Sequence, residues 1–583
     1  MKIIGEYMPQ DAFHIRRLAS ELNGTLTGGK INRISQVSKD ELTFIIYTGK
    51  RTVKLILSTN ASNARVCLSQ TEKEPLAVAP NFCMLLRKHL LGAEILFVKQ
   101  YAFERIIEIG LHCTTDFSES DRVLHCELMG KYSNIVLSEK GVILGALKTA
   151  SLTDDNHRIL LSGARYEYPA PQDKLSVFDG AGMRSRLLSF TENRTQNVDG
   201  EELSRFVFEN VAGLALPTAK EMVRRCAAQN GGVYAALSDN AKMPLWAFIT
   251  AFCQGEECNA HLRLQDGAPT EFFAFAVDGA KPMPSLCDAE DEFYFYKESK
   301  KHFEDKKRKL ESAARTLKKK AEKRLQETTE RLREAEKAEE NRIKGELLTA
   351  NLYALEKGMT SVEVVNWYDE QGGTIKIALD STLSPSKNAQ RYFKTYNKQK
   401  RAKEILEPMQ KAERAEIAYA ESIFAMIAAA DAEEDLKEIQ TELIDGGFLP
   451  KERARISAKK GKKEPEIPFR EYEHNGYKIL AGRNNLQNDR LLRVAAPDDI
   501  WLHTQKYHSS HVIICTQGGQ VQDETLLYAA EICAYYSDGR GADKIPVDYC
   551  KRKFVKKPSK SKAGFVVYTD YKTVLVKPEK HKE

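Results

Sequence analysis

The sequence has no run of about 18 apolar residues, the length that a membrane-spanning helix needs. Its first residues, Met1–Glu6, contain neither the apolar region nor the cleavage site of a signal peptide. The formal net charge of its 583 residues is only +6, so any nucleic-acid surface must come from local basic patches. From these absences we expect a cytoplasmic protein with no membrane partner.

Closely spaced cysteine pairs are also missing. The 11 cysteines are scattered singly, which is typical of reduced, partly buried thiols. The tightest group is Cys253, Cys258 and His261, with a wide first spacing and no fourth ligand nearby. A helix end with a turn at Gly255 fits this group better than a zinc site does. We therefore expect no metal and no cofactor.

A chain of this length is too long for one hydrophobic core, and it predicts roughly three to five domains. A hydrophobic content of 42% and a charged content of 29% indicate a folded, charge-rich protein. We predict a multidomain protein of mixed α/β and α class. The predicted parts are a mixed α/β domain (1–172), a helix-hairpin-helix module (175–285), a long antiparallel coiled-coil hairpin with a small insert at its tip (290–445), a linker (446–468) and a C-terminal α/β domain (469–583).

The first predicted domain combines helices with strands. Residues 12–22 have the apolar spacing of a helix, and Asp11 is placed to cap its start. A second helix is expected at 82–91. Alternating or apolar runs predict strands at 42–47, 52–57, 65–68, 105–111 and 134–137.

Residues 127–134, Glu-Leu-Met-Gly-Lys-Tyr-Ser-Asn, are the most informative string in this domain. Gly130 can take a positive φ or let another backbone approach closely. Lys131 adds a positive charge, while Ser133 and Asn134 add short polar groups that cap and turn. A tight turn between two strands and a functional loop both fit this string.

The second predicted part begins with a helix at 203–211, a turn at Gly213 and a helix at 217–226. In a helix-hairpin-helix, the backbone amides of such a turn can hold a phosphate. An ordinary helical hairpin fits the same residues, because the turn itself contains no basic residue.

Residues 297–344 contain no proline or glycine and carry a coiled-coil seam. The seam positions are Leu310, Ala314, Leu317, Ala321, Leu325, Thr328, Leu332 and Ala335. A second seam is expected at Ala402, Ile405, Met409, Ala412, Tyr419, Ile423, Met426 and Ala430, with a kink or a helix start at Pro408. Because a small folded insert separates the two seams, we favour one antiparallel hairpin over a self-associating coiled coil.

The C-terminal domain holds the phrase Gly-Arg-Asn-Asn at 482–485 and a basic stretch at 551–562. Neutralising several phosphates gives salt-dependent binding without base reading, so we expect RNA backbone binding here. The residues that we expect to contact RNA are Arg483, Asn484, Asn485, His503, His511, Lys553, Lys556 and Lys557. No nucleophile, carboxylate pair or third ligand joins the two histidines, so we predict neither a catalytic nor a metal site.

These motifs together resemble the NFACT family, the ribosome-quality-control factors once labelled fibronectin-binding proteins. The resemblance rests on 127–134, on Gly-Arg-Asn-Asn-x-Gln-Asn-Asp at 482–489, on Asp-Ile-Trp-x-His at 499–503, on Ser-His-Val at 510–512, and on Asn-Ala-Gln at 388–390 in the coiled-coil insert. It covers essentially the whole chain. It implies an N-terminal NFACT domain and a C-terminal NFACT-R RNA-binding domain.

The resemblance also implies a function. Bacterial members bind the large ribosomal subunit that still carries a stalled peptidyl-tRNA. They recruit tRNA(Ala), and an alanine tail that marks the nascent chain for degradation grows without a message. A small S4-like RNA-binding protein assists them. Peptide bond chemistry would belong to the ribosome, so the chain would be a tRNA-recruiting elongation factor and not an enzyme.

The tRNA-binding residues implied by the resemblance are Asp11, Glu104, Arg105, Lys131, Ser133 and Asn134. Two positions depart from the family pattern: Asp11-Ala12 stands where the family has Asp-Gly, and Glu104-Arg105 where it has Asp-Arg. Arg105 keeps the fork that clamps a phosphate or base edge. Glu104 keeps the charge, one methylene further out, which leaves tRNA selectivity open.

Two other functions remain as alternatives. A DNA-glycosylase-like protein of distantly similar fold would need an N-terminal proline nucleophile, whereas this chain begins Met1-Lys2-Ile3. A fibronectin-binding surface adhesin, as the older family label suggests, would need a signal peptide or an anchor.

Overall fold

The computed structural model describes residues 10–115, 118–150, 158–192, 198–232, 237–239, 241–255, 258–370, 372–450, 467–559 and 561–582. The first nine residues, Lys560 and residues 451–466 of the predicted linker (446–468) lie outside this part of the chain. The chain divides into two compact units, Met1–Lys300 and Lys301–Glu583. None of the described helices is both long and apolar enough to cross a membrane.

Within its described residues, unit 1 contains an antiparallel sheet of nine strands in the order β4-β3-β2-β1-β5-β6-β7-β8-β9. The strands are β1 Lys30–Ser38, β2 Glu41–Tyr47, β3 Thr52–Ser58, β4 Arg65–Leu68, β5 Glu94–Gln100, β6 Ile106–Thr115, β7 Ser118–Glu127, β8 Asn134–Glu139 and β9 Val142–Ala146. All five strands expected from the sequence are present. The sequence interpretation missed β1, β5, β7 and β9.

Helices α1 (Ala12–Leu26) and α2 (Asn81–Leu90) pack against this sheet. Helix α1 buries Phe13, Leu18 and Leu22 on one face, as its apolar spacing predicts. Its N-cap is Asp11, whose side chain accepts a hydrogen bond from the backbone of His14.

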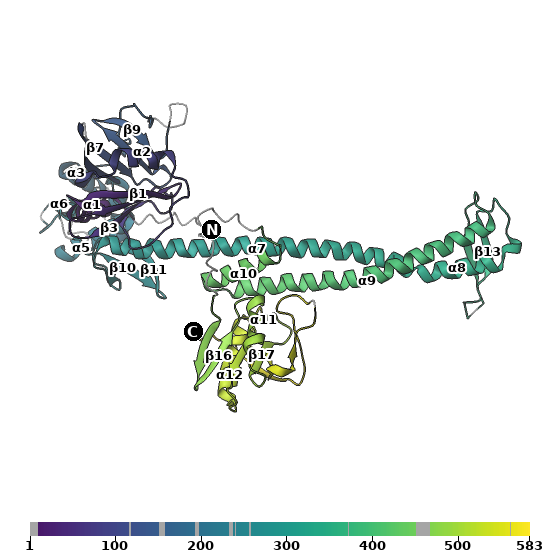
Figure 1. Ribbon diagram of the computed structural model, residues 1–583. Helices are drawn as coiled ribbons and strands as arrows, with labels where there is room; N and C mark the ends of the chain where they lie inside the picture. The colour runs from purple at the N-terminus through teal and green to yellow at the C-terminus, as the bar shows by residue number, and fades with distance from the viewer. Residues whose placement is uncertain are drawn as a thin grey trace. The chain divides into compact units, whose positions relative to one another are not determined.

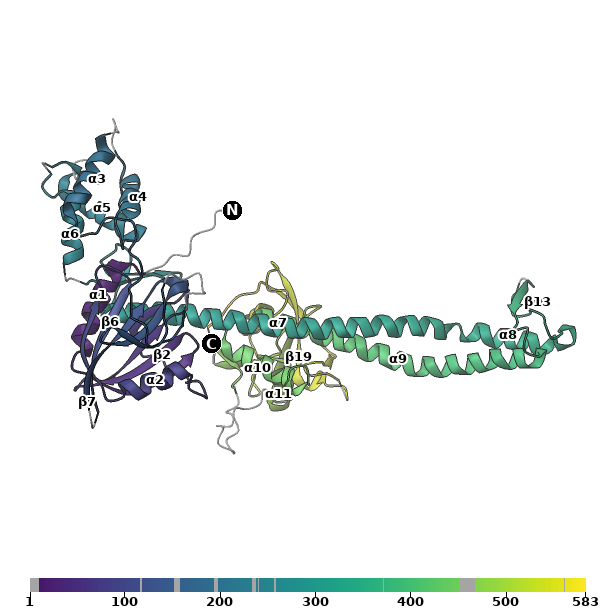
Figure 2. The ribbon, with the colours of Figure 1, turned by 90° about the horizontal axis from the view of Figure 1, so that it is seen from above.

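A helical module follows in unit 1, and Figure 2 shows its four helices gathered beside the sheet domain. They are α3 Gly180–Glu192, α4 Gly200–Asn210, α5 Leu216–Asn230 and α6 Leu245–Gln254, followed by strands β10 His261–Gln265, β11 Ala268–Phe273 and β12 Lys281–Pro282. Leu203 and Val207 of α4 belong to the same hydrophobic cluster as Ala12 and Phe103. The sheet and the helices therefore share one core across the boundary predicted near residue 172.

The long helix α7 (Leu286–Glu336) is anchored in unit 1 by its first turns. The carboxylate of Glu21 accepts hydrogen bonds from the backbone amides of Leu286 and Cys287, at 2.8 and 3.1 Å. Further along, Arg65 pairs with Glu298 at 2.6 Å. Negative charge at a helix N-terminus is stabilising, so Glu21 fixes where this helix begins.

Unit 2 contains the predicted hairpin, in which α7 and α9 lie side by side in both views (Figures 1 and 2). Its other elements are α8 Ala338–Ala350, β13 Ser361–Val365, β14 Thr374–Ala378, α9 Pro385–Ala429 and α10 Glu433–Asp445. The paired strands β13 and β14 form the small insert at the tip. The structure therefore shows an antiparallel hairpin with a small two-stranded insert at its tip.

The second seam was only partly correct. Tyr419, Ile423 and Met426 are buried as expected, whereas Ile405 and Met409 are 63% and 42% exposed. The buried positions further towards the start of α9 are Leu406 and Glu413, and Glu413 accepts a hydrogen bond from Thr328 of α7. Helix α9 packs against two partners, so the periodicity of its apolar residues does not follow one face. Pro408 lies inside this helix and does not mark its start.

The C-terminal domain is a six-stranded sheet, as far as the structure describes it, in the order β15-β16-β18-β17-β19-β22. The elements are β15 Arg470–His474, β16 Tyr477–Ala481, α11 Asn485–Val494, β17 Ile500–Thr504, β18 Val512–Cys515, α12 Asp523–Tyr535, β19 Ile545–Lys551, β20 Val555–Lys556, β21 Val567–Tyr568 and β22 Lys572–Val576. Its helix α11 lies next to α9 and α10 of the hairpin (Figure 1).

Candidate functional site

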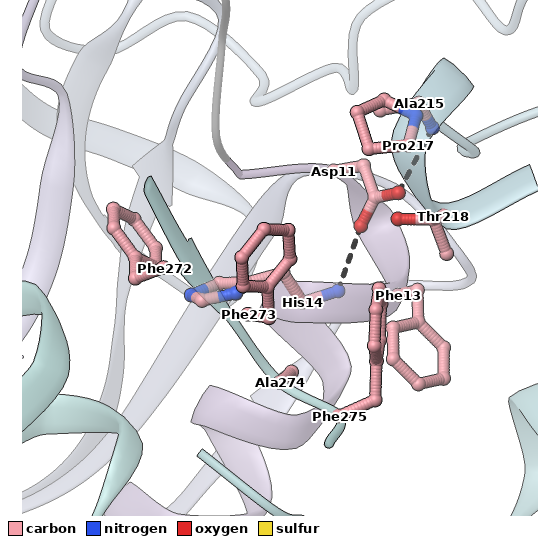
Figure 3. A pocket seen from close by; sticks show the side chains of 10 residues that line it. All are labelled: Asp11, Phe13, His14, Ala215, Pro217, Thr218, Phe272, Phe273, Ala274 and Phe275. Atoms are coloured by element: carbon pink, nitrogen blue, oxygen red, sulfur yellow. Dashed lines mark hydrogen bonds between the residues drawn. The ribbon is translucent and has the colours of Figure 1, made fainter. Parts of the chain in front are cut away.

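Asp11 joins two helices of unit 1. Its Oδ1 accepts a hydrogen bond from the backbone N–H of His14 at 2.9 Å, and its Oδ2 accepts one from Ala215 at 2.8 Å, next to the start of α5 (Figure 3). The backbone N–H of Ala12 donates to the carbonyl of Gly213 at 2.8 Å. Both carboxylate oxygens of this predicted tRNA-binding residue are therefore engaged inside the protein.

The departure at Ala12 is accommodated by Gly213, which has a φ of +77°. A Cβ atom at Gly213 would lie 2.7 Å from the Cβ of Ala12 and 2.8 Å from the carbonyl oxygen of Phe103. Glycine is therefore required at this turn both for its backbone angle and for the space that the Ala12 methyl group occupies.

Glu104 and Arg105 lie on the loop between β5 and β6, close to the start of α1. The side-chain amide of Gln100 donates to the carbonyl oxygens of Ala12 and Glu104, at 2.7 and 2.8 Å. The carbonyl of Arg105 accepts a hydrogen bond from the backbone of Leu128 at 2.8 Å. These bonds bring the loop, the start of α1 and the 127–134 turn together.

Both charged side chains of this loop are half-buried. Burial lowers the pKa of Arg105, while the negative charges of Glu104 and Asp11 oppose that shift. Burial also raises the pKa of Glu104, against the effect of Arg105. The structure therefore places three of the predicted tRNA-binding residues in one electrostatically coupled group.

The 127–134 string connects β7 to β8 through a short 3-10 helix at Gly130–Tyr132, and Gly130 has a φ of +59°. Asn134 is buried, and its side chain bonds the backbone N–H and carbonyl of Lys148 at 2.9 and 2.7 Å. Ser133 is fully buried, whereas Lys131 is exposed. Of the three residues predicted here, Lys131 alone presents its polar group to solvent.

Two features of this region were missed from the sequence. Tyr132 is 63% exposed, and the ammonium of Lys131 lies 4.7 Å from its ring centroid. Glu127, which begins the string, is buried and pairs with Arg158 at 2.7 Å while accepting a hydrogen bond from Tyr166. The alternation of β7 did not indicate this burial, since Glu127 lies on the strand face opposite the core residues Leu124 and Cys126.

In the C-terminal domain, the phrase at 482–485 docks the domain onto α10. Arg483 pairs with Asp435 at 2.7 Å, and Arg470 pairs with the other oxygen of the same carboxylate at 2.7 Å. All three side chains are buried. A charge buried away from water is stable only beside an opposite charge. The carboxylate of Asp435 on α10 therefore holds Arg470 of β15 and Arg483, which lies just before α11, in place.

The two asparagines continue this contact. Asn484 is the N-cap of α11, and its amide donates to the carbonyl of Glu438 at 2.9 Å. The backbone and side chain of Asn485 both donate to the carboxylate of Glu442, at 3.0 and 2.9 Å. Tyr419 donates a third hydrogen bond to that carboxylate. These hydrogen bonds lower the pKa of Glu442, but burial has the larger effect and raises it to about 7.

The two predicted histidines form an aromatic layer with Trp501. The ring of His503 is parallel to that of Trp501 at 5.7 Å, and the ring of His511 is perpendicular to that of His503 at 5.5 Å. Burial lowers the pKa of His503 to about 4 and that of His511 well below its ordinary value. Both imidazoles are therefore neutral at pH 7 and do not supply positive charge to a phosphate.

The lysines of the basic stretch are exposed. Lys553 and Lys551 pair with Asp498 at 3.3 and 3.0 Å on the surface. Lys557 pairs with Asp489, and Lys556 is exposed to solvent. Of the predicted C-terminal group, Lys553, Lys556 and Lys557 are the residues with charged side chains at the surface.

No group of three or more histidine, cysteine, aspartate or glutamate side chains in the described part of the chain is arranged to hold a metal ion. Cys253 is buried at the end of α6, and Cys258 is exposed.

The family profile described as NFACT N-terminal and middle domains matches residues 11–464, and the one described as NFACT protein RNA binding domain matches residues 468–568. A protein of Bacillus subtilis (strain 168) named Rqc2 homolog RqcH is 34% identical over 584 residues, or 98% of each chain. A protein of the same name from Streptococcus pneumoniae serotype 2 (strain D39 / NCTC 7466) is 32% identical over 99% of each chain.

A solved structure described as the N-terminal part of the fibronectin/fibrinogen-binding protein from Streptococcus suis is also similar to this chain. It is 25% identical with a TM-score of 0.40, and the match covers 49% of this chain and 98% of that chain.

Proposed function

The chain belongs to the NFACT family, and we propose that it acts in ribosome-associated quality control. The observation that carries this proposal is the match to proteins named Rqc2 homolog RqcH along 98% of both chains. Because both NFACT regions occur in order along one chain, the proposal concerns the whole protein and not one transferable domain.

In the proposed reaction cycle, the protein binds the large ribosomal subunit that carries a stalled peptidyl-tRNA. It recruits tRNA(Ala), so that an alanine tail grows on the nascent chain and marks it for degradation. A small S4-like RNA-binding protein is the proposed helper, and the cytoplasm is the proposed location. Peptide bond formation is assigned to the ribosome, and this protein contributes positioning and effective concentration.

The N-terminal group supports the tRNA role. The planar guanidinium of Arg105 suits a phosphate or the edge of a base, because its donors match two acceptors at once. Its half-buried position beside Glu104 and Asp11 fixes where that fork can lie. Lys131 is exposed on the neighbouring turn and adds a charge that attracts phosphate.

We propose that the Gly213 turn positions Asp11 and does not itself hold a phosphate. Supporting this role, the amide of Ala215 already donates to Asp11 and the carbonyl of Gly213 already accepts from Ala12. Helices α4 and α5, which flank this turn, would thus support the neighbouring tRNA site by packing against it and not by binding RNA.

In the C-terminal domain, we propose that Lys553, Lys556 and Lys557 contact the RNA backbone. Arg483, Asn484 and Asn485 hold the domain on the hairpin, which sets where those lysines reach. Binding through lysines weakens steeply with salt, because each phosphate contact releases counterions.

The experiment is to isolate the tagged full-length protein from its own cells in low and in high salt and to sequence the bound RNA. Large-subunit RNA together with one strongly enriched tRNA species is the expected result, and that tRNA names the added amino acid. Large-subunit RNA without tRNA would limit the function to binding the subunit. Recovery of no RNA, with the protein in a cell-wall fraction, would overturn the proposal in favour of an adhesin.

A further inference from the structure

A groove in unit 2 lies between helix α9 and the C-terminal domain. It encloses about 790 Å³, which falls within the roughly 300–1,000 Å³ of typical small-ligand sites. One wall consists of Ala412, Ala415 and Ala418 on α9, and the opposite wall includes His503 and the residues around Gly564. The small alanines leave the space open, and the polar groups lie across from them.

Asn488 offers a hydrogen-bond donor to this groove. Its Oδ1 accepts from the backbone N–H of His511 at 3.0 Å, and a backbone N–H can only donate, so the oxygen must be the atom on that side. The NH₂ group of Asn488 has no hydrogen-bond partner among the described residues. Asn488 lines the groove and is otherwise buried, so its NH₂ group is a hydrogen-bond donor available to a ligand in the groove.

His503 offers an acceptor. Its Nδ1 lies 2.8 Å from the carbonyl oxygen of Thr504, and a carbonyl can only accept, so Nδ1 carries the proton. In the neutral imidazole, Nε2 is then a hydrogen-bond acceptor. The parallel ring of Trp501 holds this orientation.

Asn485 adds a second acceptor. Its NH₂ group donates to Glu442 at 2.9 Å and to Ser422 at 3.0 Å, which leaves Oδ1 on the other side. That oxygen lies beside Gly564, where an added Cβ would come within 2.3 Å of it. Gly564 has a φ of +76° and donates its N–H to Asp489, which holds the loop beside this oxygen.

The rim of the groove carries flat rings and positive charge. Tyr507 and Phe565 are 38% and 55% exposed at this rim. Lys411, Lys506 and Lys562 are exposed on the same rim. Exposed rings beside lysines are the combination that binds single-stranded nucleic acids.

We propose that this groove binds one unpaired nucleobase of an RNA strand, while the rim lysines contact the phosphates on either side of it. The donor of Asn488 and the acceptors of Asn485 and His503 match the mixed donor and acceptor edge of a base. The rings of Tyr507 and Phe565 provide stacking surfaces. The proposal rests on the RNA-binding function above and names what the C-terminal domain holds.

The test measures binding of the full-length protein to three fluorescently labelled RNAs that carry equal numbers of phosphates. One is an unstructured single strand, one is the same strand with abasic sites, and one is a blunt duplex. We expect the single strand to bind about tenfold more tightly than the abasic strand, as stacking of one base allows. Competition with free AMP and UMP distinguishes an RNA site from a site for a small nucleotide.

Two variants probe the groove by different means. Asn488→Asp keeps the acceptor for His511 but replaces the open donor with an acceptor. Ala415→Trp fills the groove from an exposed position of α9 without touching any of the polar groups. Ala428→Trp is the matched control, since Ala428 is exposed on the same helix outside the groove.

Both groove variants should abolish the preference for the single strand over the abasic strand, while Ala428→Trp should keep it. Equal binding of single and abasic strands by the unmodified protein would overturn the groove proposal and leave backbone binding intact. Failure of all three RNAs to bind would instead overturn the RNA-binding function. Competition by free AMP or UMP at micromolar concentration would replace the RNA base with a small nucleotide as the occupant.

Discussion

In the group around Arg105, the side chains of Glu104 and Arg105 are only half-buried, beside a buried Asp11, whereas all the charged side chains around Asp435 are buried. The first group has two carboxylates beside one guanidinium and remains partly open to solvent. The second has two guanidiniums on one buried carboxylate and leaves neutral amides and imidazoles on the nearby groove. Clustered polar residues therefore serve two purposes in this chain, presenting charge in unit 1 and docking a domain in unit 2.

The largest expected effect comes from breaking the sealed group. Asp435→Asn keeps the shape of the side chain but removes the buried negative charge that Arg470 and Arg483 share, which costs about 3–5 kcal/mol. We expect faster hydrogen exchange in α11 and a lower urea midpoint. Glu434→Gln is the control, since Glu434 is the exposed neighbour on α10. Equal exchange in the two variants would contradict the docking role of Asp435.

The corresponding change in unit 1 should cost less. Asp11→Ala removes the acceptor for the amides of His14 and Ala215, which costs about 1–3 kcal/mol. Hydrogen exchange should rise at the starts of α1 and α5 together, because one side chain caps both. Asp173→Ala, at an exposed position, should change neither. A rise at α1 alone would show that Asp11 does not join the two helices.

Glu442 gives the docking contact a pH dependence. Its pKa is raised from 4.5 to about 7, so the folded protein binds this proton more tightly than the unfolded chain does. The free energy of unfolding should therefore fall as pH rises from about 4.5 to about 7, by on the order of 1–3 kcal/mol. The lowered pKa values of His503 and His511 give the opposite slope below pH 6.5.

The comparison with Glu442→Gln isolates the carboxyl group, because the histidines are unchanged. The difference in unfolding free energy between the two proteins should vary between pH 5 and pH 7 in urea titrations. Glu407→Gln, on an exposed part of α9, should track the unmodified protein. A constant difference between the Glu442→Gln variant and the unmodified protein would show that Glu442 does not titrate in this range.

The smallest expected effect concerns the departure from the family pattern. Glu104→Asp restores the family's Asp-Arg pair and moves the carboxylate back by one methylene. Because the charge beside Arg105 is kept, tRNA recovery should change by less than about threefold, within the range of exposed charge pairs. A loss of tenfold or more would mean that the longer side chain of Glu104 is itself part of the tRNA contact.

The sequence was enough to locate most local structure. Asp11 and the apolar spacing after it correctly predicted α1, and the glycine at 213 correctly predicted a turn between two helices. The seam of α9 was partly wrong because this helix packs against both α7 and the C-terminal domain. A single periodicity cannot describe two contact faces.

Burial of the polar motif residues could not be predicted from the sequence. Arg483 and Asn485 look like surface residues of an RNA-binding domain, and their partners Asp435 and Glu442 lie more than 40 positions earlier in the chain. Pairing across such a distance depends on how the domain docks on α10. Lys556 illustrates the converse, since its exposure follows from its charge alone.

The most direct test of the central claim compares the RNA that co-purifies with the unmodified protein, with Arg105→Ala and with Arg51→Ala. Arg51 is an exposed arginine of the same domain and serves as the matched control. We predict that Arg105→Ala loses at least about tenfold of its tRNA while keeping large-subunit RNA, and that Arg51→Ala keeps both RNAs. Unchanged tRNA recovery with Arg105→Ala would contradict the claim that the N-terminal group holds tRNA.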